Sequence, residues 1–199
     1  MAQDGVAAGK KNAARRGATL VFSDEAGFLM APLVRRTWAP RGQTPVLPQR
    51  GRSRRKVSVI AALSLSPQRR RVRSYFGLLP DANYDGLAIR HFLQALSRHL
   101  KGPIDLVWDR LPAHRGGPAA HWLARHPRIR VHLLPGYAPE LNPVELIWGH
   151  AKMNALANFA PLDTPALCQQ VEHALLDIAA DPTLLRRFII HCPLSLRLK

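Results

Sequence analysis

Short apolar runs separated by turn-forming residues dominate the first part of the chain. Segments 18–28, 56–65 and 72–79 are mostly apolar and rich in β-branched or aromatic residues, which predicts strands. A further short strand is predicted at 33–38. Segment 39–55 is rich in Pro, Gly and Arg and is predicted to be a loop or an open hairpin. Because the connections are short, we expect these strands to pair antiparallel.

The pattern changes after Pro80. Within 84–100 the apolar residues recur at spacings of three and four, which predicts an amphipathic helix. The rest of the chain alternates between the two patterns and predicts strands at 104–109 and 129–134 and helices at 117–126, 143–154, 164–180 and 183–191. Strand–helix–strand units of this kind favour an α/β domain with a mixed sheet flanked by helices.

Length and composition indicate one globular domain. The chain has 199 residues, of which 47% are hydrophobic. We expect a basic, flexible leader over residues 1–17 and a single domain over 18–199. No run approaches the roughly 18 apolar residues that a membrane span needs, and the N-terminus lacks the apolar core of a signal peptide. A cytoplasmic protein, with no membrane partner, is therefore expected.

Net charge points to a polyanionic partner. The sequence has 29 Lys and Arg against 13 Asp and Glu, a formal charge of +16. A field of that sign attracts nucleic acid. Most of these residues are Arg, which binds phosphate as a planar fork, although a genome of high GC content would also favour Arg codons. The two cysteines, Cys168 and Cys192, have no metal-ligand spacing and are expected to be buried or incidental thiols.

Three acids stand at positions typical of active sites in α/β folds. Asp24 follows an apolar strand, Asp109 ends another, and Glu145 lies in the first turn of a predicted helix. Three converging carboxylates would raise one another's pKa unless a divalent cation compensated them. Mg²⁺ and Mn²⁺ prefer such hard oxygen ligands. The pattern alone leaves open whether the three acids meet.

Neighbouring acids are assigned other roles. Glu25 directly follows Asp24 on a strand, so it is expected to point to the opposite face and to have a supporting role. Glu140 is expected to shape or cap its loop, and Asp105 to be solvated at the start of a strand. Trp148, three residues after Glu145, is expected to be a core residue rather than a base-stacking one.

Four segments resemble mariner-like DDE transposases. They are 19–25 (TLVFSDE), 38–45 (WAPRGQTP), 107–115 (VWDRLPAHR) and 133–148 (LLPGYAPELNPVELIW). The most specific is the Pro-x-Tyr-x-Pro-Glu-Leu-Asn-Pro-x-Glu-x-x-Trp pattern that begins at Pro135. The similarity is greatest to the branch of bacterial insertion sequences, the IS-six-thirty family, and it extends over roughly residues 18–160.

The resemblance implies a ribonuclease H-like fold with a mixed five-stranded sheet. It also implies that Asp24, Asp109 and Glu145 are the catalytic, metal-binding triad, with Asp109 and Glu145 36 positions apart. Two Mg²⁺ or Mn²⁺ ions would be bound there, about 4 Å apart. The implied activity is DNA cleavage at transposon ends followed by strand transfer into target DNA.

Several basic residues are candidates for DNA contacts. For each Arg the alternative is a solvated charged face, and for His114 the alternative is a structural hydrogen bond. Arg110 departs from the family pattern, which often has Asn or Gly after the second Asp. The candidates are Arg41, Arg52, Arg54, Arg55, Lys56, Arg110, His114 and Arg115.

The resemblance also bears on partners. Full-length relatives carry helix-turn-helix modules ahead of the first Asp, but only 23 residues precede Asp24. We therefore expect no such module here. A separate chain could supply the helix-turn-helix module. Related enzymes act as dimers, so a homodimer on the bacterial nucleoid is expected. Three alternatives remain open: an inactive or truncated DNA-binding remnant, a ribonuclease H-like nuclease with a host role, and a fragment that binds a full-length transposase.

Overall fold

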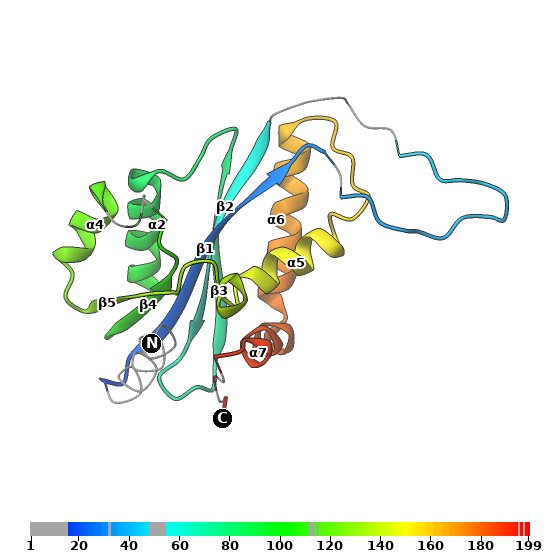
Figure 1. Cartoon of the computed structure of the whole chain (residues 1–199). Coiled ribbons are helices and arrows are strands. Elements are labelled where there is room, and N and C mark those ends of the chain that lie inside the picture. The colour runs from blue at the N-terminus through cyan, green and yellow to red at the C-terminus, as the bar shows by residue number, and fades with distance from the viewer. Residues whose placement is uncertain are drawn as a thin grey trace.

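Five strands form one mixed sheet in the order β3-β2-β1-β4-β5. The computed structural model describes residues 16–31, 33–47, 55–111, 114, 116–194, 196 and 198–199. The first three strands pair antiparallel, whereas β4 and β5 run parallel to β1 (Figure 1). The strands are β1 (Thr19–Leu29), β2 (Lys56–Leu65), β3 (Val72–Pro80), β4 (Ile104–Trp108) and β5 (Ile129–Leu133).

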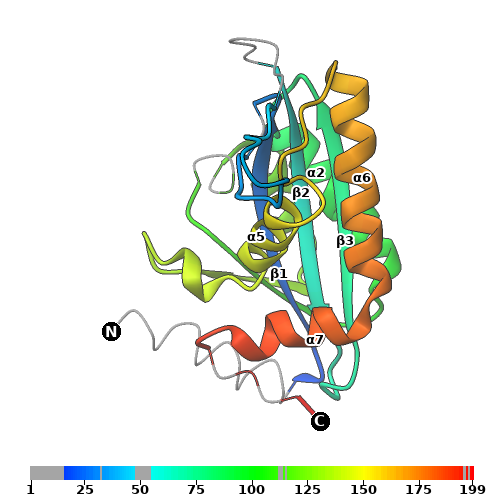
Figure 2. The same ribbon diagram turned by 90° about the vertical axis from the view of Figure 1, so that its right-hand side faces the viewer.

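Helices cover both faces of the sheet. On one face lie α2 (Gly86–His99) and α4 (Gly117–Ala124), which pack against each other. On the other lie α5 (Glu145–Met153), α6 (Thr164–Ala180) and α7 (Pro182–His191). Figure 2 shows α6 running along β3, with α7 crossing near its end. A 3₁₀ turn, η1 (Pro139–Leu141), leads from β5 into α5.

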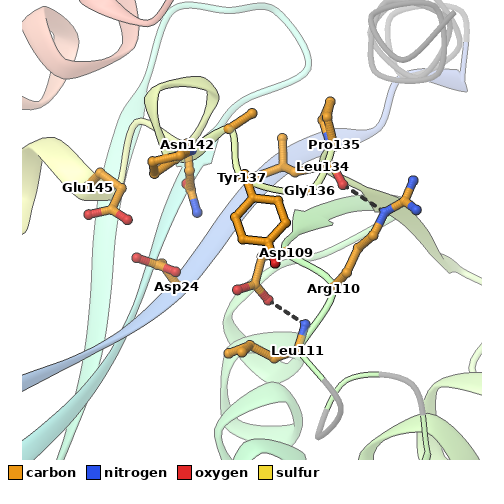
Figure 3. A pocket seen from close by; sticks show the side chains of 12 residues that line it. Asp24, Asp109, Arg110, Leu111, Leu134, Pro135, Gly136, Tyr137, Asn142 and Glu145 are labelled. Atoms are coloured by element: carbon orange, nitrogen blue, oxygen red, sulfur yellow. Dashed lines mark hydrogen bonds between the residues drawn. The ribbon is translucent and has the colours of Figure 1, made fainter.

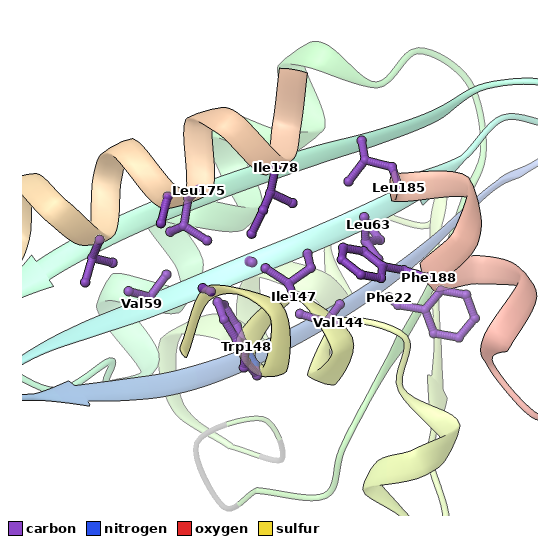
Figure 4. Packing of buried hydrophobic residues seen from close by; sticks show 14 of the residues in the cluster. Phe22, Val59, Leu63, Val144, Ile147, Trp148, Leu175, Ile178, Leu185 and Phe188 are labelled. Carbon is purple, nitrogen blue, oxygen red and sulfur yellow. The ribbon is translucent and has the colours of Figure 1, made fainter. Parts of the chain in front are cut away.

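Strand alternation divides the core between the two faces. Val21 and Ile60 point to the α2–α4 side, whereas Phe22 and Leu63 point to the side of α5, α6 and α7. On that second side, Trp148 and the other labelled residues of Figure 4 pack into one apolar cluster. Asp24 lies two positions after Phe22, so the alternation points its carboxyl group toward α5.

Aspartate caps define where three helices begin. Asp85, Asp163 and Asp181 each accept hydrogen bonds from backbone N–H groups in the first turn of α2, α6 and α7, respectively. These bonds satisfy donors that have no partner within the helix. The predicted elements agree with these bounds to within a few residues. Among the described residues, no helix is long and apolar enough to cross a membrane.

Two local predictions were wrong. Segment 33–38 is not a strand: Leu33 makes an isolated bridge to Ala157, and residues 34–40 have no regular structure. Trp38 is fully exposed. The loop after β1 extends away from the sheet (Figure 1), so among the described residues this segment has no strand beside it to supply a ladder of hydrogen bonds.

Asp105 is buried rather than solvated, with no exposed surface. Its Oδ1 atom lies 2.7 Å from Nη1 of Arg16 and 3.3 Å from Nε2 of His132. The ion pair attaches Arg16 to the sheet, although the expected flexible leader included this residue. Residues 1–15, the rest of that leader, lie outside the described residues.

Candidate active site

Asp24 is a largely buried carboxyl group on β1. Its Oδ2 atom accepts a 2.8 Å hydrogen bond from the indole Nε1–H of Trp148 on α5. Burial raises the pKa of Asp24 to about 7; the Trp148 hydrogen bond opposes that rise, and the charges of Glu145, Glu25 and Asp109 add to it. Trp148 is a core residue, as expected, but it also holds the first candidate ligand.

Asp109 directly follows β4 and is held through its Oδ1 atom. That atom accepts a 3.0 Å hydrogen bond from the backbone N–H of Leu111 and lies 2.8 Å from Nδ1 of His114. Burial alone would raise the pKa of Asp109, but the bonds from His114 and Leu111 outweigh it, so the pKa is lowered. At neutral pH Asp109 is therefore a carboxylate with a fixed orientation.

His114 lies beneath the site rather than on its surface. Its side chain is 1% exposed, and its ring stacks on Trp108 at 4.0 Å between centroids. Nε2 lies 3.2 Å from Oε1 of Glu25. Burial lowers the pKa of His114, but the bonds to Asp109 and Glu25 outweigh it and raise that pKa to about 9. Both ring nitrogens then carry protons at neutral pH and donate to the two carboxylates.

This burial bears on the two roles considered for His114 and favours the structural one. A side chain covered on both ring faces and bonded at both nitrogens does not reach DNA in this arrangement. In this structure the His114 side chain therefore makes structural hydrogen bonds. Glu25 likewise has the supporting role expected of it, since it bonds His114 while Asp24, the adjacent strand residue, bonds Trp148.

Glu145 is the first residue of α5, and Asn142 fixes the start of that helix. The Asn142 side chain is buried; its Nδ2 donates to the carbonyl oxygen of Ser23 at 3.1 Å, and its Oδ1 accepts from the Val144 N–H at 3.2 Å. Asn142 thus ties the helix start to the strand residue just before Asp24. Burial and the charge of Asp109 raise the pKa of Glu145, whereas the charge of Lys152 lowers it.

The three acids line one cavity of about 470 Å³. They come from β1, the end of β4 and the start of α5. Figure 3 shows the carboxylates of Asp24 and Glu145 facing each other, with that of Asp109 across from them. The structure therefore brings together all three residues that the resemblance assigned to the triad.

The donor set fits a magnesium or manganese ion bound together with a substrate. All three side chains offer hard oxygen ligands. The charges of Glu145 and Asp109 add to the rise in the pKa of Asp24 that burial causes. Among the described residues, no three His, Cys, Asp or Glu side chains form a ready-made metal cage. Mg²⁺ seldom uses such a cage, because it is usually held by one or two carboxylates, waters and substrate phosphates.

The candidate DNA contacts lie in several places. Arg110 lines the cavity, and its Nε donates to the carbonyl oxygen of Leu134 at 3.0 Å. Arg41 is exposed in the loop before β2, and Lys56, half-buried, begins β2. Arg55 forms a 2.6 Å ion pair with Asp81. The other three, Arg52, Arg54 and Arg115, lie outside the described residues.

Two residues of the site were not identified from the sequence in the roles they have here. Asn142 entered the sequence analysis only as part of the Pro135–Trp148 motif, although its side chain bridges the start of α5 to Ser23. Tyr137, on the cavity rim, is fully exposed and has a φ of 57°, which is uncommon for a residue with a side chain. The Asn-Pro-x-Glu pattern pointed to the first, whereas nothing in the hydrophobic pattern pointed to the second.

Comparison with known proteins identifies the family. The profile described as "DDE superfamily endonuclease" matches residues 19–167. The chain belongs to the DDE superfamily endonucleases. The three candidate residues Asp24, Asp109 and Glu145 all fall within the matched segment. No curated protein matches the chain significantly.

Solved structures give the same fold. The chain is similar to Mos1 mariner transposase in its paired-end complex with Mn, with a TM-score of 0.66 and 17% identity over 96% of this chain and 58% of that one. It is also similar to the Mos1 catalytic domain, with a TM-score of 0.60 and 15% identity over 96% of this chain and 86% of that one. The predicted ribonuclease H-like α/β fold is thereby confirmed.

The chain spans little more than half the length of Mos1 transposase in that complex. The segment it covers corresponds to most of the Mos1 catalytic domain.

Proposed function

We propose that this chain is the catalytic domain of a DNA transposase of the mariner-like kind, in the bacterial IS-six-thirty branch. It would cut a phosphodiester bond at a transposon end and join the freed 3′-hydroxyl to target DNA. The observation that carries the proposal is the convergence of Asp24, Asp109 and Glu145 on one cavity in a DDE superfamily chain. The Asn-Pro-x-Glu motif supports the finer branch assignment.

The chemistry needs two displacements at phosphorus. In the first, a water oxygen bonds to the phosphorus atom and the bond to the 3′ oxygen breaks, leaving a 3′-hydroxyl and a 5′-phosphate. In the second, that hydroxyl attacks a target phosphodiester and the target's own 3′ oxygen leaves. Two Mg²⁺ or Mn²⁺ ions, when bound, would activate the attacking oxygen and stabilise the leaving one.

The residues of this chain divide the task of holding that arrangement. Asp24 and Asp109 are fixed by Trp148 and His114, so their free oxygens keep a constant geometry. Glu145 is exposed at the start of α5 and adjusts more easily to the substrate. Arg110, on the cavity wall, is positioned to contact a phosphate beside the one that reacts.

The remaining DNA contacts belong to the same proposal. Arg41 and Lys56 are available as phosphate contacts at the loop side of β2, and Arg52, Arg54 and Arg115 are further candidates outside the described residues. Arg55 would have to share its guanidinium between a phosphate and Asp81. The formal charge of +16 supports a role for all of them in non-specific attraction to DNA.

We further propose that the chain works as a homodimer on paired DNA ends, in the bacterial cytoplasm at the nucleoid. The Mos1 complex of similar fold is a paired-end complex, and two DNA ends would suit two copies of a catalytic chain. The helices of the described residues all pack on the faces of the one sheet. Recognition of the transposon end is therefore proposed to come from a helix-turn-helix module outside these residues, supplied for example by a separate chain.

Cleavage and joining of labelled DNA tests the proposal. The DNA carries the ends of the element that encodes this chain, either intact or already nicked, and Mn²⁺ is the metal. Asp109→Asn is the matched control, because it keeps the side-chain volume but removes one ligand charge. We expect cut or joined products with the native chain and none with the control.

Each other outcome has a defined meaning. Cleavage without joining, strongest on branched or hybrid substrates, would favour a nuclease with a host role. No product from folded protein on nicked ends would indicate an inactive remnant, and copurification of a larger homologue would indicate an interaction fragment. Equal products from the native chain and Asp109→Asn would place the chemistry elsewhere.

A further inference from the structure

A second, strongly basic groove lies at the outer edge of the sheet. It has a volume of about 540 Å³ and is lined by the first residues of β3, the end of α2, and the junction of α6 with α7. Its basic residues are Arg70, Arg71, Arg73, Arg186 and His99. It shares no lining residue with the cavity that holds the triad.

Hydrogen bonds hold the lining of the groove in a fixed arrangement. Arg186, on α7, donates from Nη1 to the carbonyl oxygen of Arg70 at 2.9 Å and from Nη2 to that of Lys199 at 3.2 Å. The turn before β3 is closed by Ser66, whose Oγ accepts from the N–H groups of Arg70 and Arg71. The backbone that carries the other arginines is therefore held against α7.

Its lining combines an apolar floor with a cationic rim. Val72 and Leu185 are buried at the floor, whereas Arg71 and Arg73 are exposed. No residue that lines the groove is acidic. The nearest acid in sequence, Asp181, is engaged with the N–H groups of Thr183 and Leu184 at the start of α7.

We propose that this groove binds the sugar-phosphate backbone of double-stranded DNA, outside the segment that occupies the catalytic cavity. Arginine guanidinium groups on a rigid rim provide charge-assisted bonds to phosphate oxygens. The apolar floor suits the deoxyribose between successive phosphates. The proposal rests on the chain acting on DNA, but it does not require the triad to be active.

A competing occupant is a peptide strand. β3 is an edge strand, and an edge offers unpaired backbone groups to another chain. The charge of the groove favours DNA, because four arginines around the edge would require an acidic peptide, whereas every DNA backbone supplies the anions.

The test is DNA binding by a double variant and a matched control, without divalent metal so that catalysis plays no part. Arg71→Ala with Arg73→Ala removes two exposed charges at the β3 edge. Arg125→Ala with Arg130→Ala removes two exposed charges at the opposite edge, near α4 and on β5. Fluorescence anisotropy measures the affinity of each protein for a long non-specific duplex between 50 and 200 mM salt, a range over which phosphate contacts change affinity strongly.

We expect the groove variant to bind roughly tenfold more weakly and its salt slope to fall by about 1.8, since each phosphate contact contributes about 0.9. The control should change little in either quantity. Arg71→Lys with Arg73→Lys should recover much of the affinity, because charge is restored. Thermal unfolding shows whether each variant is folded; if the double Ala variant is not, Arg71→Gln alone replaces it.

Three results would overturn the proposal. Equal losses in the groove and control variants would show that net charge alone governs binding. If the folded Arg71→Ala, Arg73→Ala variant bound DNA as tightly as the native chain, the groove would not be a DNA site, and a peptide strand would remain as the candidate ligand of the β3 edge. An absence of DNA binding by the native chain would exclude the groove as a DNA site. A different result, normal DNA binding by Asp109→Asn without cleavage, would show that binding in the groove is independent of the triad.

Discussion

The Nδ1 atom of His114 lies 2.8 Å from Oδ1 of Asp109, so a buried imidazole holds the second acid of the proposed triad. On its other side the same ring bonds Glu25, and its face stacks on Trp108. The second acid is thus fixed from below by a side chain that has almost no exposed surface.

His114→Gln is expected to weaken Mn²⁺ binding about 10- to 100-fold, the usual cost of removing a group that orients a metal ligand. An amide can donate to Asp109 or to Glu25 but cannot replace the ring that bridges both. Titration calorimetry measures the affinity. His121→Gln is the control, since the His121 ring hydrogen-bonds the Gly117 carbonyl within its own helix. Equal effects of the two substitutions would contradict the prediction.

Metal binding is expected to depend on pH through Asp24. Its pKa of about 7 in the metal-free protein means that a proton competes with the ion below that pH. Mn²⁺ affinity should therefore rise with pH up to about 7 and change less above it. The free energy of unfolding changes with pH in the opposite direction. The raised pKa of Asp24 stabilises the fold most below about pH 4, near the pKa of a free Asp. That stabilisation is lost as pH rises through about 7.

Calorimetric titrations from pH 5.5 to 8.5 check the first part, and urea unfolding of the native chain beside Asp24→Asn checks the second. As pH rises from 5.5 to about 7, the native chain should lose stability relative to Asp24→Asn. A parallel dependence in both proteins would mean that another group titrates.

Trp148→Phe is expected to move the pH dependence of Mn²⁺ binding to higher pH. The indole N–H stabilises the ionised form of Asp24, so its loss raises the pKa of that group further. The phenyl ring still fills most of the buried site. Trp122→Phe on α4 is the control, and a shift of the same size there would show that the effect is a general one on stability.

Tyr137→Ala is expected to weaken binding of single-stranded DNA at the cavity by about 1–3 kcal/mol, the usual value of one stacked base. The ring is fully exposed on the cavity rim, and its backbone is held at a φ of 57°. Tyr137→Phe keeps the ring and the same backbone constraint, so it should bind like the native chain. Anisotropy with a short oligonucleotide distinguishes the two, and a loss in both variants would exclude stacking.

Asp105→Asn is expected to destabilise the domain by about 3 kcal/mol, in the range for breaking a buried ion pair. Asp105 is fully buried and pairs with Arg16, whose side chain is 20% exposed. Asp81→Asn breaks the exposed pair with Arg55 and should cost much less. Urea unfolding measures both, and similar losses would mean that burial of Asp105 adds nothing.

The sequence was sufficient for most of the fold because alternating burial defines the strands directly. Asp24 could be placed at the site since it continues the phase of Leu20 and Phe22, and Glu145 because it starts a helix after Asn-Pro. The triad's convergence needed more than pattern, namely the resemblance in the Pro135–Trp148 motif.

What the sequence did not predict depends on contacts between distant residues. Asp105 looked like a solvated strand end, but Arg16 and His132 contact its carboxyl group from two other segments. His114 was assigned two possible roles because only the position of Glu25, 89 residues away, shows that both its nitrogens are occupied. Segment 33–38 has strand-like residues, but no strand lies beside it in the part of the chain that the structure describes.

The order of the elements has a consequence for synthesis on the ribosome. All five strands precede α5 in the chain, so the sheet can assemble while Glu145 is still unmade. The nascent protein therefore carries two of its three acids without the helix that completes the cavity and supplies Trp148. The order of the chain therefore makes the candidate site incomplete until α5 has been translated.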